Sequence, residues 1–123
     1  MPKLTHSQSA FLNAQRVGHL STADKLGQPH VVPVCFIIKG DRLYIAIDEK
    51  PKRSGASQLK RVRNIQSNPS VCFVADRYND DWSQLGYVLI RGTAAILESG
   101  DEHTQAISSL REQYSQYATM ALE

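Results

Sequence analysis

The sequence has no long hydrophobic run. No segment approaches the ~20 consecutive apolar residues that a membrane-spanning helix needs. The N-terminal stretch MPKLTHSQSAFLNAQ has neither the apolar core nor the cleavage pattern of a secretory signal. We therefore expect a cytoplasmic protein. Its 123 residues, 41% of them apolar and 21% charged, are enough for one domain spanning 1–123.

Cysteine is scarce, and motifs for catalysis or metal binding are missing. Cys35 and Cys72 lie in apolar runs without C-x-x-C spacing, which favours buried thiols in a reducing compartment. The histidines and the acidic residues of the segment DRYNDDW lack metal-ligand spacing. No nucleophile elbow, triad order or carboxylate pair is present, so the catalytic residues are unknown. The histidines are His6, His19, His30 and His103, and the acidic residues are Asp76, Asp80 and Asp81.

Positive charge is modest overall, with a net charge of +2, but it is concentrated in one place. The concentration follows a strand-like run, LYIAID, and continues into a helix-like run, LKRVRNIQSNP. Cations that converge on the start of a helix suit a bound phosphate, although a solvated helix face remains an alternative. Six of the 14 Lys and Arg residues fall between positions 50 and 63: Lys50, Lys52, Arg53, Lys60, Arg61 and Arg63.

Turn residues and apolar spacing predict five or six strands, with helices at the ends and one inserted. Thr5 and Gln8 have the spacing of a capping box at the start of the first helix. Gly27 suits a turn, and Gly92 predicts a bend or bulge in a long strand. This order favours a mainly β fold, a small antiparallel barrel. The predicted helices cover 4–16, 57–67 and 101 onward, and the predicted strands cover 17–22, 30–38, 42–48, 70–76 and 85–97.

The strand predicted over 30–38 is apolar on both alternating faces, so something beyond its own core must cover it. Val32, Val34, Phe36 and Ile38 share one face, opposite Val31, Pro33, Cys35 and Ile37. A proline inside such a strand marks an edge or bulge, or a side of the backbone that a ligand occupies. Both interpretations of Pro33 stay open.

The inserted helix is predicted to pack with one side and present cations with the other. At 100° per residue, Leu59, Val62 and Ile65 share one side. The opposite arc holds Lys60, Arg61, Arg63 and Asn64. In the final helix, Ile107, Leu110, Tyr114 and Tyr117 have the spacing of a face that packs on the barrel.

The order of these segments resembles the flavin-binding split-barrel family, which includes pyridoxamine 5′-phosphate oxidase and its FMN- or deazaflavin-dependent relatives. The resemblance covers about Arg16 to Leu97 and is strongest to the small deazaflavin branch. It rests on GQPHVVPVCF, a hairpin, LYIAID, the basic loop, LKRVRNIQSNPSVCFVAD, an acidic loop with Trp, and RGTAAIL. It implies a homodimer of six-stranded, Greek-key antiparallel split barrels with flanking helices. Each of two clefts between the subunits would hold a cofactor.

The resemblance also implies which residues meet that cofactor, either FMN or the deazaflavin coenzyme F-420. Lys60 and Arg61 match the phosphate-binding pair, and Lys52 and Arg53 match further phosphate contacts. Val32, Pro33 and Val34 match the strand whose backbone lies along the ring, and Ala46 and Ile47 match the neighbouring strand. Tyr87 lies near a ring-contacting position that is glutamine in the oxidase. Trp82 fits core or dimer packing, with stacking on the cofactor as the alternative.

The sequence departs from the family pattern in two respects. The family generally continues into a last strand that closes the barrel, whereas this sequence ends at Glu123, so we expect that strand to be absent or the barrel to close differently. The tryptophan and arginine that serve substrate binding near the oxidase's C-terminus have no counterpart, which argues against oxidation of pyridoxamine phosphate itself.

Three hypotheses for function follow. The first is an oxidoreductase that transfers hydride to or from a small organic substrate through its cofactor. The second is a flavin-binding carrier or sensor without turnover. The third is a small barrel that binds nucleic acid, although one Trp and a net charge of +2 argue against it. The resemblance favours the first, with no nucleic acid and no membrane as partners.

Overall fold

The computed structural model describes residues 4–47 and 59–118. Lys52 and Arg53, predicted as phosphate contacts, lie outside these residues. In chain order the elements are α1 (His6–Asn13), β1 (Gly18–Ala23), β2 (Pro29–Val34), β3 (Ile37–Lys39), β4 (Arg42–Tyr44), α2 (Lys60–Ser67), β5 (Ser70–Arg77), the 3₁₀ turn η2 (Trp82–Gln84), β6 (Gly86–Thr93), α3 (Asp101–Gln113) and the 3₁₀ turn η3 (Ser115–Ala118).

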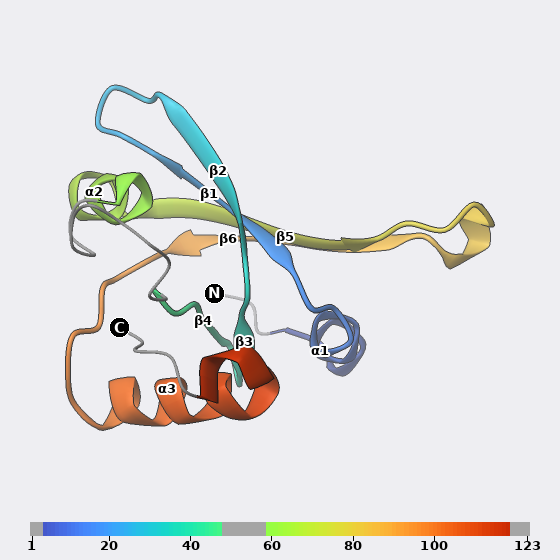
Figure 1. Cartoon of the computed structure of the whole chain (residues 1–123). Coiled ribbons are helices and arrows are strands. Elements are labelled where there is room, and N and C mark those ends of the chain that lie inside the picture. The colour runs from blue at the N-terminus through green and yellow to red at the C-terminus, as the bar shows by residue number, and fades with distance from the viewer. Residues whose placement is uncertain (1–3, 48–58, 119–123) are drawn as a thin grey trace.

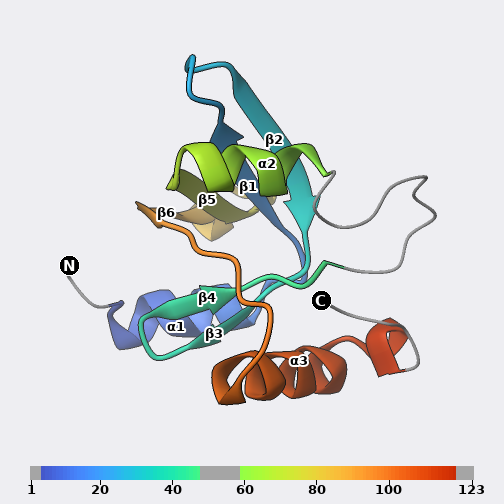
Figure 2. The ribbon, with the colours of Figure 1, turned by 90° about the vertical axis from the view of Figure 1, so that its left-hand side faces the viewer.

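The predicted mainly β, antiparallel fold with flanking helices is confirmed. Four strands form one sheet in the order β2-β1-β5-β6, and β3 and β4 form a separate two-stranded sheet. The described strands therefore form a four-stranded and a two-stranded sheet, where one six-stranded barrel was expected. In Figures 1 and 2, α3 lies on the far side of the β3–β4 hairpin from the large sheet, and α2 lies beside the β1–β2 hairpin.

Turn and cap chemistry sets several boundaries as predicted. Thr5 and Gln8 form the capping box of α1, with reciprocal bonds of 2.8 and 3.1 Å. Gly27 and Gly40 have φ of 84° and 63°, a region that a residue with a Cβ adopts only at a cost. These glycines lie in the turns that return β1 into β2 and β3 into β4.

The prediction of one continuous strand over 30–38 is wrong. β2 ends at Val34 and β3 begins at Ile37 in the other sheet. Between them, the Phe36 N–H donates to the Tyr114 hydroxyl (3.1 Å), which shares its own hydrogen between the carbonyl oxygens of Phe36 (2.9 Å) and Arg16 (3.0 Å). A distant tyrosine thus satisfies backbone groups that a continuous strand would have given to a neighbour.

The large sheet and α1 bury the main apolar core. Phe36 and Phe73 meet edge to face, with ring centroids 4.9 Å apart. Gly18 lies against the Phe73 ring and leaves no room for a larger residue, since a Cβ there would be 2.2 Å from the Phe73 Cζ. One of the two apolar faces of the 30–38 segment lies in this core, where Val34 and Phe36 are buried and Val32 and Ile38 half-buried. The fully packed members of this core are Leu12, Leu20, Val34, Phe36, Phe73 and Ala75.

A second, smaller core forms between α3 and the β3–β4 side. Ala46, Leu110, Tyr114 and Tyr117 are buried there, with Cys35 and Ile37 packed against them. The prediction that the spaced tyrosines pack on the β structure is confirmed. Because α3 ends at Gln113, they do so from its C-cap and from η3 and not from the helix itself.

Two further predictions about boundaries are corrected. β6 stops at Thr93 and not at 97, because its partner β5 begins only at Ser70, which pairs with Thr93. One further bond follows, from the Ala94 N–H to the Pro69 carbonyl (2.9 Å). Gly92 is not a bulge, since it pairs with Val71 in an unbroken one-to-one register. The chain beyond Thr93 leaves the sheet and leads to α3.

Candidate cofactor-binding site

α2 packs against β1, and its N-terminus carries the positive end of the helix dipole. Val62 is buried beneath it, and the Asn64 Nδ2 donates to the Thr22 Oγ1 at 3.0 Å. The N-cap, Leu59, provides no side-chain hydrogen bond, and the first turn contains no acidic residue. Because no described side chain caps this end, its backbone N–H groups and the helix dipole favour a bound anion.

The prediction that Asn64 shares the exposed cationic arc is wrong. Its side chain is 1% exposed, and its partner Thr22 is 2% exposed. A helical wheel groups Asn64 with the exposed residues because its side chain is polar. The amide is buried instead, because the buried Thr22 hydroxyl on β1 accepts its hydrogen bond inside the fold.

The two cations of the predicted phosphate pair are not equally available. The Lys60 Nζ lies 3.8 Å from the Asp24 Oδ2, in the turn between β1 and β2. Arg61 is half-buried and forms no ion pair with the described residues. Of the two, Arg61 is therefore the side chain that could bind an anion without first leaving a carboxylate.

Asp24 is held in place as a carboxylate. Its Oδ1 accepts hydrogen bonds from the N–H groups of Gln28 (3.0 Å) and Leu26 (2.9 Å). The Gln28 bond is the largest cause that lowers the pKa of Asp24, with smaller help from Leu26 and from the charge of Lys60, while burial opposes them. Sequence reasoning missed Asp24, whose only signal was its place in a turn with Gly27.

β2 lies at an edge of the large sheet, which leaves one side of its backbone without a strand partner among the described elements. Pro33 is exposed there, whereas Val32 and Val34 turn toward the core. The edge position accounts for the proline, since an edge strand tolerates a missing N–H. It also leaves room for a ligand along that backbone, so both interpretations of Pro33 persist.

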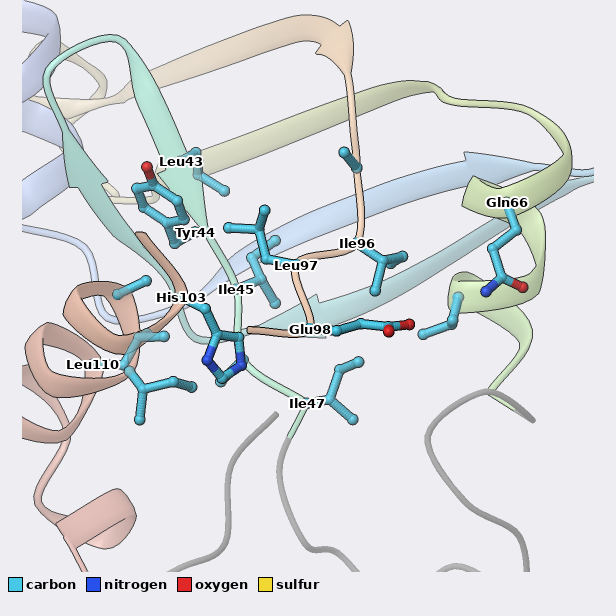
Figure 3. A pocket seen from close by; sticks show the side chains of 15 residues that line it. Leu43, Tyr44, Ile45, Ile47, Gln66, Ile96, Leu97, Glu98, His103 and Leu110 are labelled. Atoms are coloured by element: carbon cyan, nitrogen blue, oxygen red, sulfur yellow. The ribbon is translucent and has the colours of Figure 1, made fainter. Parts of the chain in front are cut away.

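Ala46 and Ile47 line a pocket of about 600 Å³. Its walls come from β4 and the chain after it, from Val62 and Gln66 of α2, from residues 95–98 and from α3. In Figure 3 the labelled side chains of Ile47, Leu97, Glu98 and His103 surround this space. Lys60 and Arg61 do not line it, and neither do residues 32–34.

Trp82 and Tyr87 lie far from α2 within one chain. They belong to the end of the β5–β6 hairpin, which projects away from the rest of the molecule in Figure 1. Trp82 is 74% exposed and Tyr87 67% exposed, so Trp82 does not pack in the chain's own core, and dimer packing and stacking on the cofactor stay predictions. The physical reason is that β1 pairs with β5 only at residues 72–74, and the hairpin extends past that support.

A polar network anchors α3 to the β3–β4 hairpin. Glu102 accepts hydrogen bonds from Tyr44 and from the Arg42 Nη1, the latter at 2.6 Å. The Tyr44 bond is the larger cause and the Arg42 bond the next that hold the pKa of Glu102 below its ordinary value. Sequence reasoning did not single out these residues, because they are 58 and 60 positions apart.

Within 4–47 and 59–118, no three His, Cys, Asp or Glu side chains lie close enough to hold a metal ion. No helix in the same part of the chain is both long and apolar enough to cross a membrane.

The antiparallel sheet, the separate hairpin and the helix inserted before β5 define a class, the split-barrel proteins of the pyridoxamine 5′-phosphate oxidase type. The chain belongs to the pyridoxamine 5′-phosphate oxidase family, whose model matches residues 4–123. The resemblance inferred from the sequence is confirmed.

Among characterised proteins, the chain is similar to the 5a,11a-dehydrotetracycline/5a,11a-dehydrooxytetracycline reductase of Streptomyces rimosus. The two are 34% identical over 97 residues, which is 78% of this chain and 66% of the reductase. The match thus spans just under two thirds of that relative's length.

Three solved structures share the fold. A conserved hypothetical protein of Mycobacterium tuberculosis has a TM-score of 0.72 at 23% identity, covering 91% of this chain and 65% of its own. The heme storage protein of Vibrio cholerae has a TM-score of 0.71 at 17% identity, covering 98% and 87%. An FAD-binding protein of Mycobacterium smegmatis has a TM-score of 0.65 at 19% identity, covering 89% and 82%.

Proposed function

We propose that the chain is an oxidoreductase that binds FMN or a deazaflavin and transfers hydride to or from a small organic substrate. The family and the reductase relative support an oxidoreductase that uses a flavin-type cofactor. The single observation that carries the finer proposal is the start of α2, which is uncapped, free of acidic residues and flanked by Lys60 and Arg61.

In this proposal the residues of the chain bind and orient, and the bound cofactor supplies the hydride chemistry. Arg61 and Lys60 hold the phosphate at the start of α2, and Lys60 exchanges Asp24 for that phosphate. The backbone of 32–34 and the residues Ala46 and Ile47 flank the ring. Lys52 and Arg53 add phosphate contacts.

We further propose that the functional unit is a homodimer. Trp82 and Tyr87 lie too far from α2 to meet the same cofactor within one chain (Figure 1). A second copy could bring its β5–β6 hairpin to the cofactor that the first copy holds, so that each site combines one chain's cations with the other's aromatic residues. This arrangement would also cover the exposed side chain of Trp82.

The test is a double variant, Lys60→Ala with Arg61→Ala, titrated with FMN and with the deazaflavin by quenching of cofactor fluorescence. Loss of two charge-assisted contacts is expected to weaken binding by about 100-fold or more. Lys39→Ala with Arg91→Ala removes the same charge from β3 and β6, and it should bind as the unmodified chain does. Equal affinity in both double variants would disprove the phosphate assignment.

The second candidate is a protein that binds its cofactor without turnover. Likeness of fold to a heme storage protein makes this a specific alternative, because that protein is named for storage. Steady-state reduction of a panel of acceptors by the reconstituted chain separates the two candidates. Sustained turnover supports the oxidoreductase, whereas tight binding without turnover supports the carrier.

A further inference from the structure

We propose that the pocket between α2, α3 and residues 95–98 binds an apolar organic molecule that carries an amine. Its volume of about 600 Å³ lies within the ~300–1,000 Å³ of typical small-molecule sites. Most of its wall is aliphatic, with Ile45, Ile47, Ile96, Leu97 and Ile107 among the lining residues. An apolar body would release water from these side chains on binding.

The polar groups of the pocket select the head group of the ligand. Among the described residues that line it there is no Lys or Arg, and Glu98 supplies a carboxylate. Glu98, His103 and Gln66 have no hydrogen bond or ion pair with the described residues, whereas Tyr44 is already bonded to Glu102. An ammonium group has only donors, and the free carboxylate and imidazole are acceptors placed in one cavity.

Figure 3 shows how the chain presents these groups. Glu98 comes from the segment that leads into α3, and His103 from the first turn of α3 itself, with Leu97 and Ile47 beside them. The acceptors therefore lie within the aliphatic wall, an arrangement suited to a molecule with an apolar body and one cationic end.

This site is distinct from the proposed cofactor anchor. Val62 and Gln66, four residues apart on one face of α2, line the pocket, while Lys60 and Arg61 do not. The described lining residues include the carboxylate of Glu98 and no Lys or Arg, so they disfavour the phosphate of a flavin. The inference therefore does not need the proposed phosphate anchor, but the pocket shares Ala46 and Ile47 with the proposed ring contacts.

The experiment uses three probes with one apolar body and different head groups: phenylbutylamine, phenylbutanol and phenylbutyrate. Each is titrated into the purified full chain by calorimetry at low salt, without flavin. We expect the amine to bind about fivefold more tightly than the alcohol, because an ion pair at an exposed carboxylate is modest. The acid should bind most weakly.

Three variants check the location. Glu98→Gln should remove the preference for the amine, and Ile96→Trp should fill the pocket and weaken all three probes. Glu112→Gln, an exposed carboxylate elsewhere on α3, should change nothing. Because Glu98 is exposed, Glu98→Gln retains the fold and keeps the test valid even if Ile96→Trp does not fold.

Three results would overturn the proposal. These are tighter binding of the acid than the amine, unchanged binding in a folded Ile96→Trp, or no binding of any probe at millimolar concentration. The last is expected if another copy or the chain's own residues fill the pocket. Lys60→Ala with Arg61→Ala should leave amine binding intact, so failure of the cofactor proposal is seen separately.

Discussion

The start of α2 and the end of the β5–β6 hairpin differ in how the fold supports them. Both were predicted to contact one cofactor. Buried Val62 and the bond between Asn64 and Thr22 hold α2 against β1. The hairpin end carries Trp82, 74% exposed, on strands that pair there only with each other.

The comparison indicates two different roles. A side chain on a packed helix is positioned before a ligand arrives, so its contacts cost little ordering on binding. An exposed aromatic on a projecting hairpin gains most of its contacts only when something packs against it. We therefore interpret α2 as the anchor within one chain and the hairpin as an arm whose contacts come from outside that chain.

The largest expected effect comes from loosening the anchor. Asn64→Ala leaves the Thr22 hydroxyl buried without its partner, and it should lower the free energy of unfolding by about 1–3 kcal/mol. Urea denaturation measures the change. Gln66→Ala, on the exposed side of the same helix, should stay within about 0.5 kcal/mol. Equal effects in the two variants would mean that the buried bond does not hold α2.

Truncating Trp82 at the end of the β5–β6 hairpin should weaken dimer formation and leave the fold of each chain intact. Trp82→Ala is expected to weaken dimer formation and flavin affinity by about tenfold, the value of one aromatic contact. Sedimentation and cofactor titration measure both. Leu26 is 87% exposed in the turn between β1 and β2. Leu26→Ala is therefore the matched control and should change neither dimer formation nor flavin affinity. If Trp82→Ala unfolds the isolated chain, the side chain is structural and the arm interpretation is wrong.

A smaller effect is expected from freeing Lys60. Asp24→Asn retains an oxygen for the backbone N–H groups of Leu26 and Gln28 but removes the charge facing the lysine. Affinity for inorganic phosphate should rise by about two- to fivefold, the size of a surface ion pair. Weaker binding of phosphate in Asp24→Asn would instead show that Lys60 needs Asp24 to be positioned.

The smallest effect concerns the network of Arg42, Tyr44 and Glu102, which anchors α3 to the β3–β4 hairpin. The pKa of Glu102 is lowered from 4.5, chiefly by the Tyr44 bond, so its contribution to stability is present above that value. It is lost as the pH falls through the lowered value. Glu102→Gln should therefore have a lower melting temperature than the unmodified chain at neutral pH, and this difference in melting temperature should disappear in acid.

Glu112→Gln on the same helix provides the control for this pH series, since its carboxylate is exposed. Its melting temperature should follow the unmodified chain at every pH. A gap that stays constant for Glu102→Gln down to the lowest pH would show that charge does not stabilise the network.

The sequence predicted short-range features well because neighbours along the chain cause them. The capping box at Thr5 and Gln8, the positive φ of Gly27 and the end of α2 before Asn68-Pro69 are all local. The inward alternation of Val34 and Phe36 was also predictable, since period two places them on one face.

The errors share a different cause. Tyr114, 78 positions along the chain, forms the hydrogen bonds at Phe36 where the strand breaks. Thr22, 42 positions from Asn64, accepts the hydrogen bond that lets this amide be buried. No local pattern encodes such partners. The cation pair was predicted by resemblance, whereas the neutralising contact of Lys60 with Asp24 became apparent only once β1 and α2 were adjacent.

The sequence by itself determined the mainly β character, the turns, the family and the cluster of cations on the inserted helix, because composition, alternation and motif order are properties of the chain. Tertiary structure decided which of those cations is unpaired, which polar side chains are buried and which aromatic residues project outward. The physical reason is that a hydrogen bond, an ion pair or a packed face exists only when two distant segments meet, and their meeting depends on the whole fold.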